Sequence, residues 1–220
     1  MSSKPVGFWK KGLQRLTVGI CYGLTRLIYR LDIQGQEHIP SAGPYVVVSN
    51  HQSIFDVPIM FHLIRPYPQV LAKQELFRNP LARYFLRLMG AVPVDRQQAG
   101  TRAVRDLIHI LRSGGIVGLY PEATRIRRGK VPGSVRPKAG SLFIARRLGC
   151  PILPLAIEYP LRAFHRTRVR IGPSYRVEAL EEGQKLSEEQ LGQRMMQRLY
   201  ALVDYDYPEI PISSEEEVPS

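Results

Sequence analysis

The feature that most constrains the fold of this 220-residue chain is a regular alternation between short apolar runs and longer amphipathic stretches. The run Tyr-Val-Val-Val at residues 45–48 is rich in β-branched side chains, which favour a buried strand. The predicted strands are residues 45–48, 69–72, 91–94, 115–120, 152–158 and 167–171, and the predicted helices are residues 57–64, 80–89, 101–112, 137–148 and a last helix capped by Ser187. This exchange predicts an α/β domain with a mixed central sheet flanked by helices.

A further helix is predicted over residues 8–31. Its apolar side chains recur every three or four residues, and they are Trp9, Leu13, Leu16, Ile20, Leu24, Leu27, Ile28 and Leu31. Its charged side chains are all basic, namely Lys10, Lys11, Arg15, Arg26 and Arg30. This pattern is typical of an amphipathic helix that docks in an anionic lipid interface. The alternative is a helix packed on its own domain. Only ten uncharged residues separate Arg15 from Arg26, whereas a membrane span needs about 20 apolar residues.

Basic side chains dominate the first 177 residues. The chain has a formal net charge of +12, but residues 178–220 hold eleven acidic and three basic side chains, which leaves +20 for residues 1–177. Such a body suits nucleic acid, an anionic membrane surface or phosphorylated substrates. A nucleic-acid-binding module is disfavoured because no aromatic RNA-binding pattern or zinc finger accompanies the charge.

The cysteines and histidines show no metal-binding spacing. Cys21 and Cys150 form no C-x-x-C pair, as is usual for thiols in a reducing compartment, which favours the cytosolic side. The five histidines fall into no H-E-x-x-H or Cys/His pattern. The sequence therefore predicts neither a metal site nor a bound cofactor.

The segment Asn-His-Gln-Ser-Ile-Phe-Asp at residues 50–56 follows the first predicted strand and leads into a helix. It separates His51 from Asp56 by four residues at a turn, so the two side chains can meet. A carboxylate on one ring nitrogen fixes the tautomer and leaves the other nitrogen free to take a proton from a hydroxyl. The spacing indicates a general base. Ser53 is an alternative nucleophile, although a serine there also suits a helix cap.

Two further motifs end in arginine beyond predicted strands. They are Gly-Ala-Val-Pro-Val-Asp-Arg at residues 90–96 and Tyr-Pro-Glu-Ala-Thr-Arg at residues 120–125. Ligands of α/β sheets gather at the carboxyl ends of strands, and the planar guanidinium suits phosphate oxygens. Arg96 and Arg125 are therefore candidate phosphate ligands.

With these motifs, and with Lys73 in Ala-Lys-Gln-Glu-Leu and the strand Cys-Pro-Ile-Leu-Pro at residues 150–154, the chain resembles the 1-acylglycerol-3-phosphate O-acyltransferase family over residues 35–158. The resemblance implies that His51 is the general base and Asp56 its partner. It also implies that Arg96, Glu122 and Arg125 shape the acceptor-phosphate pocket, with Lys73 as an addition. Ala123 stands where the family usually has glycine, and its methyl group disfavours a positive φ.

The resemblance implies transfer of a fatty acyl group from acyl-CoA or acyl-carrier protein to the sn-2 hydroxyl of 1-acylglycerol 3-phosphate, in phospholipid biosynthesis. Another lysophospholipid or glycerol 3-phosphate is the alternative acceptor, and a non-catalytic membrane scaffold is the alternative function. We expect residues 1–34 to dock on the cytoplasmic face of a membrane, residues 35–207 to form the acyltransferase domain, and residues 208–220 to be an acidic, flexible tail.

Overall fold

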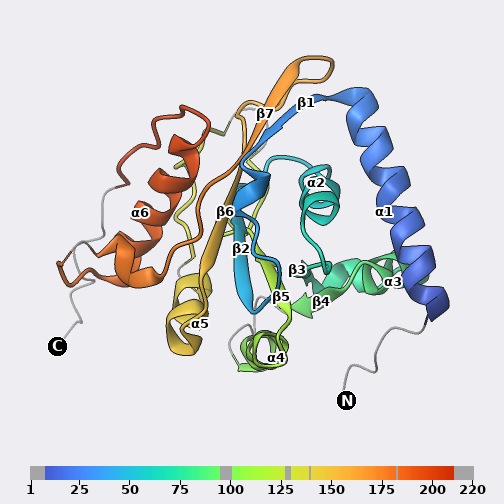
Figure 1. The fold of residues 1–220 in the computed structure, drawn as a ribbon, viewed down its shortest axis with the longest axis horizontal. Helices are drawn as coiled ribbons and strands as arrows, with labels where there is room; N and C mark the ends of the chain where they lie inside the picture. The colour runs from blue at the N-terminus through green and yellow to red at the C-terminus, as the bar shows by residue number, and fades with distance from the viewer. Residues whose placement is uncertain (1–7, 95–100, 127–129, 139, 182, 211–220) are drawn as a thin grey trace.

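A computed structural model of the chain describes residues 8–94, 101–126, 130–138, 140–181 and 183–210 (Figure 1). The α-helices are α1 (Phe8–Ile28), α2 (Asp56–Leu63), α3 (Pro80–Leu88), α4 (Thr101–Arg112), α5 (Gly140–Leu148) and α6 (Glu188–Ala201). The strands are β1 (Arg30–Gln34), β2 (Tyr45–Ser49), β3 (Gln69–Lys73), β4 (Ala91–Val94), β5 (Ile116–Leu119), β6 (Ile152–Ile157) and β7 (Arg166–Ile171). Short 3₁₀ helices are η1 (Gln36–His38), η2 (Gln74–Phe77) and η3 (Val177–Leu180). Residues 211–220, most of the predicted tail, lie outside the described residues.

The seven strands form one mixed sheet in the order β1-β7-β6-β2-β5-β3-β4. Strands β6, β2, β5, β3 and β4 all run in the same direction, whereas β7 is antiparallel to β6 and parallel to β1. The predicted α/β class with a mixed sheet is confirmed. Because five strands share one direction, the loops that follow them lie at one edge of the sheet.

Two layers of helices cover the sheet, and the alternation of side chains along β2 shows why. Val46 and Val48 pack in a core with α4, α5 and α6, whereas Tyr45 and Val47 pack in a second core with α1 and α2. All of β2 is buried, as expected for a parallel strand covered on both faces. Figure 1 shows α1 and α6 at opposite sides of the molecule.

Two predicted helix boundaries were wrong. The first helix ends at Ile28 rather than at residue 31, because residues 30–34 form β1, which pairs in parallel with β7. The alternation of polar and apolar residues in Arg-Leu-Asp-Ile-Gln is too short to predict a strand from sequence. These residues form a strand because they pair with β7. The helix expected over residues 137–148 begins at Gly140. Ser187 caps α6 as predicted, and the structure shows that the cap is a capping box with Gln190.

Helix α1 faces the protein with the side that carries Gln14, Val18 and Thr25. Val18 and Thr25 are buried, the Tyr22 ring stacks on the His62 ring of α2 at 3.4 Å between centroids, and Tyr29 meets Phe55 edge-on. The leucine and isoleucine stripe faces solvent instead, with exposed fractions of 39% for Leu13, 61% for Leu16, 56% for Ile20, 52% for Leu24 and 76% for Leu27. Helix α1 therefore does pack on its own domain, as the alternative has it, but through the face that carries Val18 and Thr25, which leaves the leucine and isoleucine stripe exposed. In the described part of the chain, no helix has the length and apolar content to cross a bilayer.

Candidate active site

The candidate site lies where the parallel strands end. Strand β2 stops at Ser49, and the next six residues form a turn into α2, whose first residue is Asp56. This turn is fixed to β6 by two buried amides. The Asn50 side chain donates to the Ile157 carbonyl at 2.7 Å and accepts from the Ile157 amide at 2.8 Å. The Gln52 side chain donates to the carbonyls of Ile157 and Glu158 and accepts from the Leu161 amide.

The His51 and Asp56 side chains meet as predicted. The Nδ1 atom of His51 lies 2.9 Å from Oδ2 of Asp56. The same oxygen accepts hydrogen bonds from the backbone amides of Gln52 at 2.6 Å and Ser53 at 2.8 Å. Asp56 is 1% exposed, and a buried carboxylate is stabilised by such amides and by its place in the first turn of a helix. With Nδ1 engaged, Nε2 of His51 is the nitrogen available for proton transfer.

The loop after β5 holds the backbone of His51 on both sides. The His51 amide donates to Oε2 of Glu122 at 2.7 Å, and the His51 carbonyl accepts from the Ile126 amide at 2.7 Å. The Tyr120 ring stacks on the imidazole with 4.3 Å between centroids. Burial and the charge of Asp56 raise the pKa of Tyr120, so its phenol is neutral. The neutral ring covers one face of the imidazole. Sequence spacing could not reveal this clamp, because its partners lie 69 to 75 positions away along the chain.

Glu122 is buried inside the protein. Its second oxygen, Oε1, accepts a hydrogen bond from the hydroxyl of Tyr200 in α6 at 2.8 Å. Burial raises the pKa of Glu122 to about 7, and the negative charge of Asp56 adds to the rise, whereas the hydrogen bonds from His51 and Tyr200 lower it. The observed partners of Glu122 make it a positioning residue for His51. A direct contact with the acceptor's phosphate, which the resemblance implied, stays a prediction.

The predicted basic residues lie around the same edge of the sheet. Lys73 is exposed at the end of β3, a strand parallel to β5. Arg125 is partly buried in the loop after β5, three residues beyond Glu122. Arg96 follows β4 but lies outside the described residues. The structure thus brings His51, Asp56 and Glu122 into contact, and the strand directions put Lys73 and Arg125 at their edge.

Two further side chains of the motifs have local roles. Ala123 adopts a φ of 52°, the left-handed conformation that its methyl group disfavours, so the turn keeps this shape without glycine. The Ser53 hydroxyl accepts a hydrogen bond from the Phe55 amide at 3.3 Å. Ser53 therefore does not cap α2 as predicted: its hydrogen bond lies within the turn before the helix, and the capping position is taken by Phe55, which has no side-chain cap.

A family model described as Acyltransferase matches residues 30–158. The chain belongs to the acyltransferase family. It is 32% identical over 131 residues to the 1-acyl-sn-glycerol-3-phosphate acyltransferase of Bacillus subtilis, which is 59% of this chain and 63% of the relative. It is 33% identical over 138 residues to the enzyme of that name in Pseudomonas aeruginosa, which is 60% of this chain and 52% of the relative.

The fold is also similar to a crystal structure of the 1-acyl-sn-glycerophosphate (LPA) acyltransferase PlsC of Thermotoga maritima. The TM-score is 0.68 at 26% identity, over 89% of this chain and 80% of that one. The human 1-acyl-sn-glycerol-3-phosphate acyltransferase alpha is 30% identical over 66% of this chain and 50% of its own length. The chain thus covers from about half to just under two thirds of the length of each of these curated relatives. The family match ends at residue 158, so Tyr200 and α6 lie beyond it.

Proposed function

We propose that this acyltransferase moves a fatty acyl group from a thioester donor to the sn-2 hydroxyl of 1-acylglycerol 3-phosphate, giving phosphatidic acid. The observation that carries the proposal is the His51–Asp56 pair, whose carboxylate also accepts two backbone amides. A partly exposed imidazole held by a buried carboxylate can take a proton from a substrate hydroxyl, and the pair itself supplies no nucleophile. The printed names of the relatives support the acceptor.

In the proposed step, Nε2 of His51 takes the proton from the acceptor hydroxyl as the oxygen attacks the thioester carbonyl. The carbon–oxygen bond forms, the tetrahedral intermediate collapses, and the carbon–sulfur bond breaks. The imidazolium then gives its proton to the leaving thiolate. Asp56 stabilises the imidazolium and holds its tautomer. The chain carries no acyl group at any stage, so the acceptor and donor must be bound together.

The candidate nucleophiles fit poorly in a covalent route. Ser53 accepts a hydrogen bond within its own turn. Cys150 is buried just before β6 begins, at the end of the sheet opposite His51, because β6 and β2 run parallel. Cys21 lies in α1, and burial raises the pKa of both thiols, which disfavours the reactive thiolate.

In this proposal the acceptor's phosphate is held by Lys73, Arg96 and Arg125. An arginine that binds phosphate with two parallel hydrogen bonds loses one of them when lysine replaces it. Arg96→Lys and Arg125→Lys should therefore raise the KM for the acceptor more than the KM for the donor. Equal increases for both substrates would indicate general damage to the site.

The proposed donor is acyl-CoA or acyl-carrier protein, and both are acidic. The basic stretch that would meet them consists of Arg125, Arg127, Arg128, Lys130, Arg136 and Lys138. The deciding experiment compares the purified protein on 1-acylglycerol 3-phosphate, another lysophospholipid and glycerol 3-phosphate, with each donor. His51→Ala should lower turnover by roughly 10² to 10⁴ in a folded protein. Near-normal turnover of a folded His51→Ala protein would end the assignment.

Helix α1 is the proposed membrane-docking element, on the cytoplasmic face where a thioester donor is available. Its outward stripe of leucines and isoleucine is exposed to solvent, and Arg15 and Arg26 are exposed on the same helix. Residues 1–34 would supply this element, although residues 30–34 also join the sheet of the acyltransferase domain at residues 35–207. Residues 208–220 would form the acidic tail.

The docking proposal predicts two separable effects on binding to anionic vesicles. Replacing Leu16 and Leu24 with Ser removes apolar surface worth up to about 1.5–3 kcal/mol per fully buried side chain. Replacing Lys10, Lys11 and Arg15 with Gln removes roughly 1 kcal/mol per charge, and added salt should mimic that loss. Equal binding of the unchanged protein to neutral and anionic vesicles would refute the electrostatic part.

A further inference from the structure

We infer that the loop between β6 and β7 is a second lipid-contacting element, which inserts the ring of Phe164 into an anionic bilayer beside the carboxyl end of α1. The contact is formed by residues 162–166, Arg-Ala-Phe-His-Arg, outside the stretch matched by the family model. The inference rests on the proposed docking of α1, and it adds a second point that would fix the orientation of the protein on the membrane.

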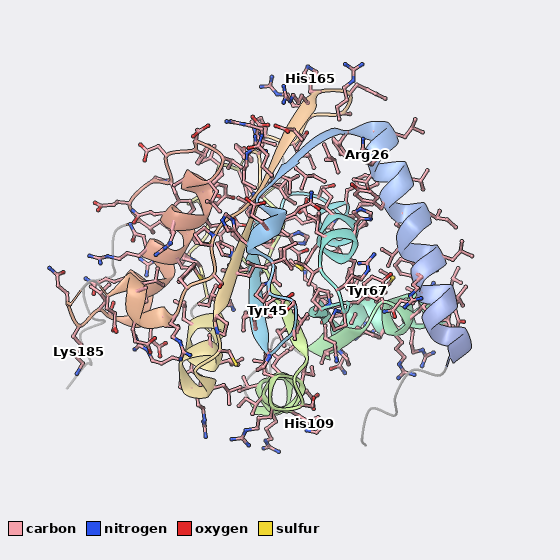
Figure 2. All side chains as sticks on the ribbon, in the orientation of Figure 1. Arg26, Tyr45, Tyr67, His109, His165 and Lys185 are labelled. Carbon is pink, nitrogen blue, oxygen red and sulfur yellow. The ribbon has the colours of Figure 1, made fainter. Side chains whose placement is uncertain are left out.

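The loop is attached directly to the end of α1. The Phe164 amide donates to the Ile28 carbonyl, the last of the helix, at 2.6 Å. The Arg30 amide donates to the His165 carbonyl at 3.2 Å. Figure 2 shows His165 at the tip of the β6–β7 loop and Arg26 on the neighbouring end of α1. The loop therefore lies directly beside the carboxyl end of α1, close to Leu27, the last exposed leucine of the stripe.

Phe164 presents its ring to solvent in an unfavourable backbone conformation. Its side chain is 72% exposed, one of the most exposed large apolar side chains described. Its φ is 63°, in the left-handed region that a bulky residue rarely adopts. Such a conformation costs of the order of 1–2 kcal/mol relative to a normal one. The folded protein leaves most of the ring in solvent in return, which points to a function at the surface.

The charges around the Phe164 ring indicate which kind of surface it would contact. Arg162, His165 and Arg166 flank Phe164 and are exposed, and Arg26 and Arg30 lie exposed on the adjoining end of α1 and start of β1. The nearby acid, Asp32, forms ion pairs with Arg166 at 3.3 Å and Arg170 at 2.8 Å. An apolar ring within a basic rim matches the interface of an anionic bilayer, where acyl chains lie beneath phosphate groups.

Tryptophan fluorescence tests the two contacts separately, because Trp9 in α1 is the only tryptophan. The unchanged protein reports on α1, and the double variant Trp9→Phe/Phe164→Trp reports on the loop. Vesicles of phosphatidylcholine and phosphatidylglycerol should shift the emission of both to shorter wavelength. Phospholipids brominated in the acyl chains should quench both. The matched control is Trp9→Phe/Phe143→Trp, because Phe143 is 48% exposed on α5, on the opposite face of the sheet, and its emission should not change.

The outcomes distinguish the loop from the helix. A response of Trp9 without a response of the Phe164→Trp reporter would overturn the loop contact and leave the docking of α1 intact. No response of either reporter would overturn both contacts. Neither result bears on acyl transfer, which is measured with detergent-dispersed acceptor.

The variant Phe164→Gly separates docking from folding, because glycine adopts a positive φ without strain. Its midpoint of thermal unfolding should stay the same or rise. Its affinity for the mixed vesicles should fall about tenfold, as expected for an aromatic ring withdrawn from an apolar environment. Unchanged affinity, or an equal loss in Phe143→Ser, would overturn the inference.

Discussion

Replacing Glu122 with Gln tests whether a buried, titrating carboxyl group holds the backbone of His51. Glutamine has nearly the same shape, and its amide oxygen can still accept from the His51 amide. It has no charge to bury and no proton to release. Because burial raises the pKa of Glu122 from 4.5 to about 7, the folded protein binds this proton more tightly than the unfolded chain does.

The sign and size of the effect follow from that difference. The stabilisation from the bound proton is complete below the unfolded pKa and is lost as the pH rises toward and through 7. A pKa difference of one corresponds to about 1.4 kcal/mol, so the wild type should lose about 2–3 kcal/mol of stability through Glu122 between pH 5 and pH 8. The Glu122→Gln variant should not lose it. The variant should therefore be close to the wild type in stability at pH 5 and clearly more stable at pH 8.

Urea denaturation of both proteins at several values of pH measures this difference, since the other titrating groups are common to both. Tyr200→Phe is a second arm, because it removes a hydrogen bond that lowers the pKa of Glu122. In Tyr200→Phe the pKa of Glu122 should be higher, so the pH-dependent loss of stability should continue to a higher pH than in the wild type. A difference between wild type and Glu122→Gln that stays constant from pH 5 to pH 8 would refute the reasoning.

Three further changes have defined outcomes. Asp56→Asn should lower turnover by about 10² or more in a folded protein, because the imidazolium loses its charged partner, and turnover near that of the wild type would exclude the pair as the base. Ala123→Gly should raise the free energy of unfolding by about 0.5–1 kcal/mol, since glycine relieves the left-handed strain but is more flexible when unfolded; a urea titration that shows destabilisation would contradict this. Ser53→Ala should keep most of its turnover, and wild type mixed with radiolabelled donor alone should carry no label after rapid denaturation. Label that disappears with Ser53 would require an acyl-enzyme.

The sequence by itself determined the features that depend on neighbours along the chain. The α/β alternation, most strand and helix positions and the capping box of α6 follow from local periodicity and local hydrogen bonds. The meeting of His51 with Asp56 belongs to the same class, because one tight turn before a helix brings the two together. The apolar stripe of α1 could also be predicted, since it is a property of a single helix.

Only the tertiary structure decided what depends on contacts between distant segments. Residues 30–34 are a strand because β7 offers them a partner, and α1 turns its stripe outward because Val18 and Thr25 already fill the contact with the domain. The motif singled out Glu122, but only the tertiary structure shows that its two oxygens accept hydrogen bonds from His51 and Tyr200. Tyr200 stands 78 positions beyond Glu122, and no local pattern encodes a hydrogen bond across that separation. The local periodicity of the sequence shows which face of a helix or strand is apolar. The packing of the whole fold decides which distant residues contact that face and which of them hydrogen-bond to its buried polar atoms.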